Sequence, residues 1–150
     1  MVKSSALQKY SLFGGLLEEQ IDQILPLMEQ ENYEAGENII TEGETNDKIR
    51  FILTGRVAVV KNHVTLFEFK EGDAFGEMEV LDVMPSAATN VALEPTRVMS
   101  ISNRAFRSIY KIDIKAFSLM LMNLARDLSR RLRVMNDMVV TGKEPPPESS

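Results

Sequence analysis

The chain has 150 residues, of which 44% are hydrophobic and 26% are charged, as expected for one globular domain with an apolar core. Its 17 lysines and arginines stand against 22 aspartates and glutamates, and the formal net charge of −5 excludes a protein that coats nucleic acid with its whole surface. The absence of cysteine excludes thiolate catalysis, disulfides and cysteine-bound metal, and the single histidine, His63, cannot form a multi-histidine metal site.

The sequence shows neither of two apolar patterns, a membrane-spanning run or a secretory signal. No apolar run approaches the ~18 residues that span a membrane. The first ten residues, MVKSSALQKY, lack the apolar stretch of a secretory signal peptide. We therefore expect a soluble, cytoplasmic protein without a membrane partner, and the lack of cysteine agrees with a reducing compartment.

The N-terminal segment has a helical pattern. Apolar residues recur every three or four positions over residues 12–28, which predicts amphipathic helix. The pair Gly14-Gly15 favours a break, and Pro26 disturbs the last turn because proline lacks the backbone N–H that a helix uses. We expect helices over about residues 5–30.

The pattern changes over residues 33–102 to short runs of β-branched and other apolar residues, separated by glycines. Many short strands with glycine turns are typical of a β-sandwich or barrel. Asn62 and His63 lie between two such runs, and asparagine tolerates the left-handed backbone of a tight hairpin. We therefore place His63 at a hairpin tip rather than in a ligand site.

A helical pattern returns after Ser102, which suits the N-cap position, and predicts closing helices over about residues 103–140. Apolar residues there form a stripe with steps of three and four along the helix. The stripe consists of Phe117, Leu121, Leu124, Leu128, Leu132, Met135 and Val139. The segment 143–150, rich in proline and serine, has little to bury and is predicted to be disordered.

The length of this stripe bears on the oligomeric state. It covers ~34 Å of helix, more than a small β-roll needs to cover itself. Packing on its own domain accounts for part of the stripe, and we expect a second copy of the chain to cover the distal part. The predicted assembly is a homodimer. The predicted interface residues are Leu121, Leu124, Leu128, Leu132 and Met135.

The segment GDAFGEMEVLDVMPSAAT, residues 72–89, is the most informative for function. Gly76 can bring backbone N–H groups close to a ligand, and residues 77–81 can form one short helical turn. The Glu77 carboxylate can accept hydrogen bonds from two neighbouring sugar hydroxyls. Spacing alone leaves an alternative open, in which Gly76 is a turn glycine and Glu77 complements a helix dipole.

The same segment resembles the phosphate-binding cassette of cyclic-nucleotide-binding domains, which reads approximately F-G-E-(L/M)-A-L, five residues, then R-(A/T)-A. The matching residues are Phe75, Gly76, Glu77 and Met78 at its start, and Pro85, Ala87 and Ala88 at its end. The resemblance extends through the leading helices, the glycine turns and the long closing helix. It implies an α+β, mainly β fold: an eight-stranded antiparallel jelly-roll with N-terminal helices and a long C-terminal helix, in one domain over residues 1–142.

The resemblance also implies a function, namely a non-enzymatic regulatory or sensor module with cyclic AMP as its ligand. It assigns ligand binding to Phe75, Gly76, Glu77, Met78, Ser86, Ala87 and Ala88. It implies neither a metal nor any other cofactor. It also implies a downstream protein partner, which these residues do not identify.

Two residues depart from the cassette. Ser86 stands where the family has the arginine that pairs with the cyclic phosphate, and Glu79 stands where it usually has a small residue. Losing one side of a buried charge-assisted pair costs on the order of 2–5 kcal/mol. We therefore expect weak binding of cyclic AMP, unless a cation such as Arg50, Arg56 or Arg97 takes over.

Other function classes compete with the sensor. A dimerising scaffold that kept the fold and lost the ligand is the principal alternative. A metal-dependent jelly-roll enzyme needs about two histidines and a carboxylate, and one histidine makes it improbable. The residues after the stripe are too few for a helix-turn-helix, so we expect no nucleic-acid partner. Four arginines of the closing helix are predicted to be solvated or to pair with a partner copy, namely Arg126, Arg130, Arg131 and Arg133.

Overall fold

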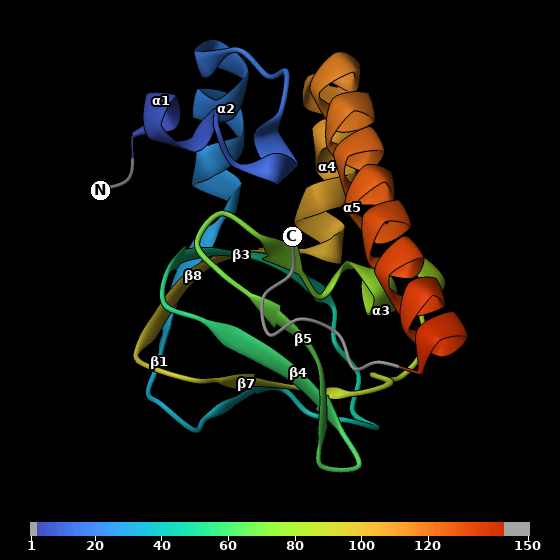
Figure 1. Cartoon of the computed structure of the whole chain (residues 1–150). Helices are drawn as coiled ribbons and strands as arrows, with labels where there is room; N and C mark the ends of the chain where they lie inside the picture. Colours follow the sequence, from blue (N-terminus) through green and yellow to red (C-terminus); the bar gives the residue numbers. More distant parts are fainter. Residues whose placement is uncertain (1–2, 143–150) are drawn as a thin grey trace.

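The computed structural model describes residues 3–142, which form a β-roll with most of its helices at one end (Figure 1). Two four-stranded antiparallel sheets make the roll, with strand orders β1-β8-β3-β6 and β2-β7-β4-β5. The strands are β1 (Glu29–Tyr33), β2 (Asn38–Ile40), β3 (Lys48–Thr54), β4 (Val57–Lys61), β5 (Val64–Phe69), β6 (Ala74–Phe75), β7 (Thr89–Ala92) and β8 (Thr96–Ser102). The predicted eight-stranded antiparallel jelly-roll is confirmed.

Helices precede the roll in sequence, interrupt it once and follow it. Four short elements precede it, namely α1 (Ser4–Leu7), η1 (Ser11–Phe13), α2 (Glu18–Ile24) and η2 (Leu25–Leu27). The others are α3 (Glu77–Asp82), α4 (Asn103–Ile112) and α5 (Ile114–Thr141). The predicted break is present, since Gly15 has a φ of +83° between η1 and α2, and Pro26 lies in the narrow turn η2 rather than in α-helix. The predicted tail, residues 143–150, lies outside the described residues.

The roll begins earlier than its predicted start at residue 33. β1 starts at Glu29, so the helical segment predicted to about residue 30 is too long. The sequence of β1, EQENY, contains no apolar run, because this strand lies at the edge of its sheet with its side chains mostly in contact with solvent. Pairing with β8, from Glu29 opposite Ser100 to Tyr33 opposite Thr96, makes it a strand despite its composition.

Two local predictions are confirmed. Asn62 and His63 have φ angles of 52° and 64° at the turn between β4 and β5, as a two-residue hairpin requires. Ser102 caps α4, because its Oγ accepts a hydrogen bond from the backbone N–H of Ala105 at 3.1 Å.

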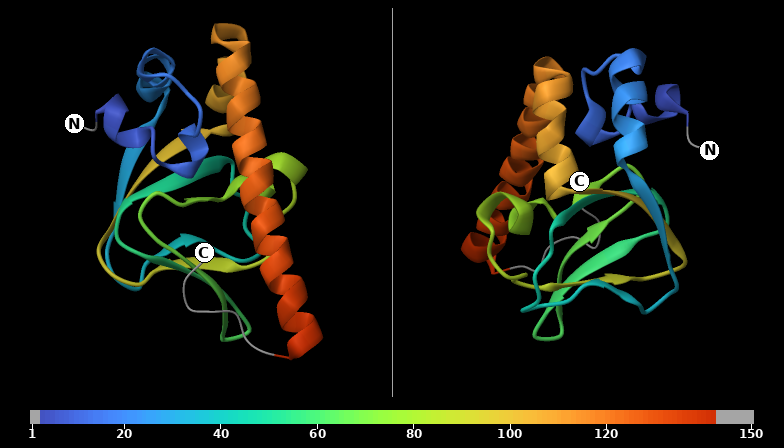
Figure 2. Two further views of the ribbon diagram at one scale, coloured as in Figure 1. Left: turned by 45° about the horizontal axis from the view of Figure 1, so that its top comes forward. Right: turned by 180° about the vertical axis from the view of Figure 1, so that it is seen from behind.

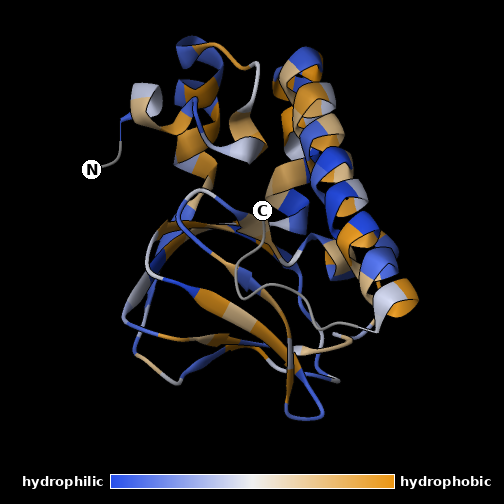
Figure 3. Cartoon of the chain, in the orientation of Figure 1, coloured by the Kyte–Doolittle hydropathy of each residue, from blue (hydrophilic) through white to orange (hydrophobic). Residues whose placement is uncertain are grey.

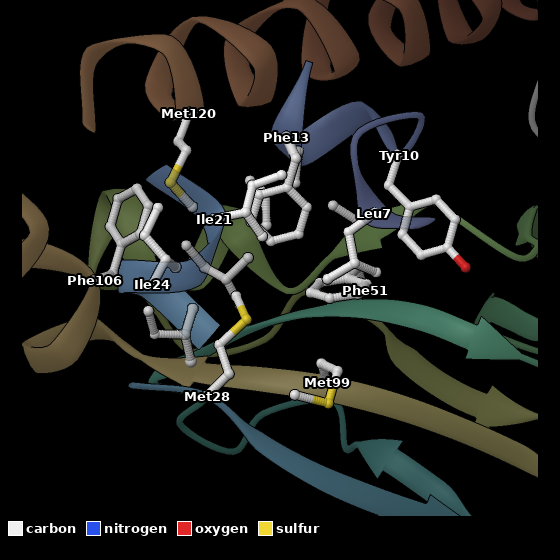
Figure 4. Close-up of a cluster of buried hydrophobic side chains, with 14 of the residues drawn as sticks. Leu7, Tyr10, Phe13, Ile21, Ile24, Met28, Phe51, Met99, Phe106 and Met120 are labelled. Atoms are coloured by element: carbon white, nitrogen blue, oxygen red, sulfur yellow. The ribbon is translucent and has the colours of Figure 1, made fainter. Parts of the chain in front are cut away.

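Buried side chains form two clusters on opposite faces of β3. Phe51 faces the helices and Ile52 faces the inside of the roll, because successive strand residues point to opposite sides. The larger cluster joins the helices to the sheet (Figure 4); it includes Leu7, Phe13, Ile21, Met99, Phe106 and Met120. The smaller cluster, inside the roll, consists of Ile40, Ile52, Val57, Phe69, Phe75 and Val98. The helical end is thus fixed to the roll by the burial of large apolar side chains.

The course of α5 determines what covers the roll. Its first half is anchored to η1 and the loop after it, since Asn123 Nδ2 donates to the carbonyls of Leu12 and Gly14, each at 3.0 Å. Ser11 Oγ also donates to Asp127 at 2.8 Å. The second half runs past α3 and along the side of the roll (Figure 2). In the part of the chain that the structure describes, no helix is long and apolar enough to cross a membrane.

Candidate functional site

A cavity of about 400 Å³ lies between the roll, α3 and the second half of α5. The strands contribute Val59, Leu66, Phe67, Phe69 and Asn90; the segment from β6 to β7 contributes Phe75, Gly76, Glu77, Met78, Glu79, Ala87 and Ala88; and α5 contributes Leu128, Arg131, Leu132 and Met135. A mostly apolar lining with few polar groups is typical of small-molecule sites. A larger groove of about 780 Å³ lies beside α1 and α2, but none of the predicted site residues lines it.

The turn at Gly76 brings α3 to the cavity. Gly76 has a φ of +85°, and a Cβ at this position would lie 2.7 Å from the carbonyl oxygen of Lys48. A side chain is therefore excluded by both backbone conformation and space. Asn46 holds the turn in place, because its Nδ2 donates to the carbonyls of Gly76 and Lys48, each at 3.0 Å. The predicted short helical turn is confirmed as α3.

Glu77 and Arg131 form an ion pair within the cavity. The side chain of Glu77 is 0% exposed, and the Arg131 guanidinium donates to its Oε1 while lying 5.2 Å from the centre of the Phe69 ring. Burial lowers the pKa of Arg131 to about 10, partly opposed by the charge of Asp73, so the guanidinium stays protonated at neutral pH. The second oxygen, Glu77 Oε2, is buried and has no hydrogen-bond partner among the described residues.

The end of the cassette is held from outside the cavity. The backbone of Ser86 pairs with the turn after β2, donating to Glu44 O at 2.9 Å and accepting from Gly43 N at 2.8 Å. Its Oγ is buried without a hydrogen-bond partner among the described residues, and Ser86 is not among the lining residues. Ala87 does line the cavity, and its carbonyl accepts from Lys61 Nζ at 2.8 Å.

Glu79 lies in the lining, although the sequence did not show where this carboxylate points. Its Oε1 accepts a long hydrogen bond from Asn46 Nδ2, at 3.4 Å. Burial raises the pKa of Glu79, and the neighbouring charge of Asp82 acts in the same direction. The environment thus already disfavours a negative charge at this position.

The family follows from comparison with known proteins. A sequence profile described as "Cyclic nucleotide-binding domain" matches residues 30–113. The chain belongs to the cyclic nucleotide-binding domain family. It is 32% identical over 127 residues to the cyclic AMP receptor protein of Thermus thermophilus, covering 81% of this chain and 57% of that protein.

Two further members of the family resemble this chain over different fractions of its length. The chain is 34% identical over 98 residues to the cAMP-dependent protein kinase regulatory subunit of Yarrowia lipolytica, covering 65% of this chain and 26% of that protein. The crystal structure of a cyclic nucleotide-binding domain from Methylobacillus flagellatus has a TM-score of 0.84 and 27% identity, covering 96% of this chain and 84% of that one. The chain therefore spans little more than half of the first of these sequence relatives and about a quarter of the second.

In this family member, the three arginines predicted as substitutes for the cassette arginine lie outside the cavity lining. Arg50 is held by Glu31 Oε1 at 2.8 Å and by Asn46 Oδ1 at 2.9 Å. Arg56 forms ion pairs with Glu68 and Glu94, and Arg97 is exposed. None of the three lines the cavity.

Arg131 is the cation that the sequence reasoning missed. The prediction of a solvated or intermolecular role for it is wrong, because it pairs with Glu77 of its own chain. A signal was present in the helical period. Arg131 follows Leu128 by three residues and precedes Met135 by four, so all three share one helix face. Arg130 pairs with Asp127 on the same helix instead.

The structure places some of the predicted interface residues in the cavity lining and others in the main core. Leu128, Leu132 and Met135 line the cavity of their own domain, so a partner copy is not needed to explain the stripe up to Met135. Leu124 is only 1% exposed in the main core, which removes it from any surface available to a partner. Leu121 packs partly against the same core. Dimerisation stays a prediction.

Proposed function

We propose that this chain is a non-enzymatic, ligand-sensing regulatory module whose cavity accepts cyclic AMP weakly and whose helix α5 reports occupancy. The Arg131–Glu77 ion pair carries this proposal, because it joins the carboxylate suited to sugar hydroxyls directly to α5. A ligand that donates to Glu77 shares its carboxylate with Arg131. Occupancy of the cavity and the position of α5 are therefore energetically linked. A chain without cysteine also suits a reducing compartment such as the cytoplasm.

Weak binding of cyclic AMP follows from two residues. Ser86 offers a hydroxyl where the family arginine offers a charged, bidentate donor, and its Oγ is not among the lining atoms. Glu79 adds a carboxylate to the lining. At ~4 Å from a phosphate and an effective dielectric near 20, its charge costs about 4 kcal/mol.

Calorimetric titration with cyclic AMP tests this function. We expect weak binding to the wild type and at least ~100-fold tighter binding, about 2.7 kcal/mol, to the Ser86→Arg, Glu79→Ala double variant. The double variant supplies the missing cation and removes the anion, while Gly76 and Glu77 are unchanged. Tight binding by the wild type contradicts the proposed role of Ser86. A well-folded double variant that gains nothing contradicts the assignment of the cavity as a nucleotide site.

A ligand-free dimerising scaffold is the second candidate function. It is favoured by the partner that Glu77 already has in Arg131, and by the apolar residues that α5 exposes near its end. The scaffold requires the oligomeric state to be independent of the cavity. The position of α5 can be monitored with a fluorescent probe attached to an introduced Asn136→Cys. If the double variant binds cyclic AMP and the fluorescence of this probe does not change, the scaffold is the better description.

A further inference from the structure

We propose that the preferred ligand of this cavity is an uncharged, nucleoside-like molecule, with a planar apolar part and free hydroxyls, rather than an anionic cyclic nucleotide. The inference rests on the proposed function, because it names the ligand class of the same cavity. It is argued from the charges of the lining, from one unsatisfied acceptor and from the apolar wall.

The lining carries more negative than positive charge. Among the described residues that line the cavity, the charged ones are Glu77, Glu79 and Arg131. Glu77 and Arg131 neutralise one another, and Glu79 remains with only a long hydrogen bond from Asn46. A cyclic phosphate would bring a second uncompensated anion into a space that burial has partly removed from water. A ligand without charge avoids this repulsion.

Neighbouring cations do not reverse this balance. Arg50 is engaged by Glu31 and Asn46 inside the roll. Lys61 lies outside the lining, where its Nζ donates to the carbonyl of Ala87 at 2.8 Å. The position at which the family binds phosphate, Ser86, contributes a neutral hydroxyl that is not among the lining atoms.

An unsatisfied acceptor points to a ligand that donates hydrogen bonds. Glu77 is completely buried, and its Oε2 has no partner among the described residues. A carboxylate oxygen can only accept, so a ligand hydroxyl or N–H group satisfies it whereas a phosphate oxygen does not. A nucleoside carries vicinal hydroxyls, while the 3′,5′-cyclic phosphate leaves only the 2′-hydroxyl free.

Two aromatic residues of the lining suit a planar apolar group. Phe69 and Phe75 are stacked with ring centres 5.7 Å apart and an angle of 16° between their planes. Leu128 and Met135 approach from α5 and complete the apolar surroundings. A volume of about 400 Å³ is within the range of small-molecule sites.

Adenosine and cyclic AMP are the probes that isolate the phosphate. We expect adenosine to bind the wild type at least ~10-fold more tightly than cyclic AMP in calorimetric titrations at equal ionic strength. Glu79→Gln removes the uncompensated charge at nearly constant shape. It should raise the affinity for cyclic AMP about 10-fold and change that for adenosine less than about 3-fold. Glu34→Gln, an exposed carboxylate outside the cavity, is the matched control and should change neither affinity.

Each outcome separates the inference from the proposed function. Equal or tighter binding of cyclic AMP by the wild type overturns the inference, as does a Glu79→Gln variant that leaves the ratio of the two affinities unchanged. If the wild type ignores adenosine while the Ser86→Arg, Glu79→Ala variant binds cyclic AMP, the inference fails and the proposed function stands. If neither protein binds either probe, both fail.

Discussion

At the scale of single residues, Val83 adopts a backbone conformation that its side chain disfavours. It ends α3 with φ and ψ of 57° and 36°, in the left-handed region that L-residues occupy at a cost of about 1–2 kcal/mol. The position after a helix is usually glycine for this reason. The side chain of Val83 is 76% exposed, so it gains little from packing in return.

Val83→Gly is therefore expected to stabilise the fold. Glycine removes the left-handed strain and gives back about 0.4–1 kcal/mol through the greater freedom of the unfolded chain, which leaves a net gain of about 0.5–1 kcal/mol. Urea unfolding followed by circular dichroism measures it. Ala125→Gly, at an exposed position within α5 and outside the predicted interface, is the control and should destabilise slightly, since glycine is a poor helix former. A Val83→Gly protein no more stable than the wild type contradicts the assignment of strain.

At the scale of elements, one carboxylate ties the edge strand β1 to the sheet. Glu31 accepts hydrogen bonds from Arg50 at 2.8 Å, Lys48 at 3.0 Å, Tyr33 at 2.8 Å and Ser100 at 3.2 Å. Burial acts to raise the pKa of Glu31, but the hydrogen bond and charge of Arg50, with the hydrogen bonds of Lys48 and Tyr33, lower it from 4.5 to about 2. This polar cluster replaces the apolar pattern that β1 lacks.

The stability of the protein should depend on pH through this cluster. Because the folded-state pKa of Glu31 is depressed, its contribution is present above pH 4.5 and is lost as the pH falls toward about 2. The contribution at neutral pH is on the order of 1–2 kcal/mol, since solvent partly screens the cluster. Glu31→Gln should lower the free energy of unfolding by that amount at pH 7, and its difference from the wild type should shrink as the pH approaches 2.

Urea unfolding of both proteins across this range measures the effect. Glu29→Gln, on the same strand and exposed, is the control and should change stability little at neutral pH. A constant difference between Glu31→Gln and the wild type at every pH would mean that the cluster acts through shape rather than charge.

At the scale of the whole molecule, the end of α5 presents apolar side chains that its own domain covers only in part. Leu132, Val139 and Val140 are 61%, 83% and 84% exposed. Figure 3 shows hydrophobic residues reaching the last turn of this helix. We expect a second copy to cover this surface, as the sequence pattern predicts, although the contact is shorter than the predicted one and excludes Leu124.

Sedimentation at micromolar concentration should therefore show a dimer. Leu132→Glu combined with Val139→Glu should convert it to a monomer, because burying two unpaired carboxylates is costly. Thr141→Glu is the matched control, since nine residues at 100° each place it on the opposite side of the helix from Leu132. A wild type that stays monomeric throughout the accessible concentration range would rule out this interface.

The sequence by itself determined those features that depend on neighbours along the chain. The Asn62-His63 hairpin, the Ser102 cap, the turn at Gly76 and the alternation of helix with strand each follow from the backbone preferences of a few adjacent residues. The order of residues in the cassette indicated the family and hence the jelly-roll. These signals persist whatever the rest of the chain does.

Only the tertiary structure decided which distant side chains meet. Arg131 and Glu77 are separated by 54 positions, and helical spacing placed Arg131 on a face without showing what that face covers. β1 became a strand because β8 supplied its hydrogen bonds and Arg50 its counter-charge. The direction of α5 across the roll, set by packing of its first half against η1, turned an apparent dimer stripe into the wall of a cavity. Such contacts depend on how whole elements pack, and the backbone preferences of neighbouring residues do not determine that packing.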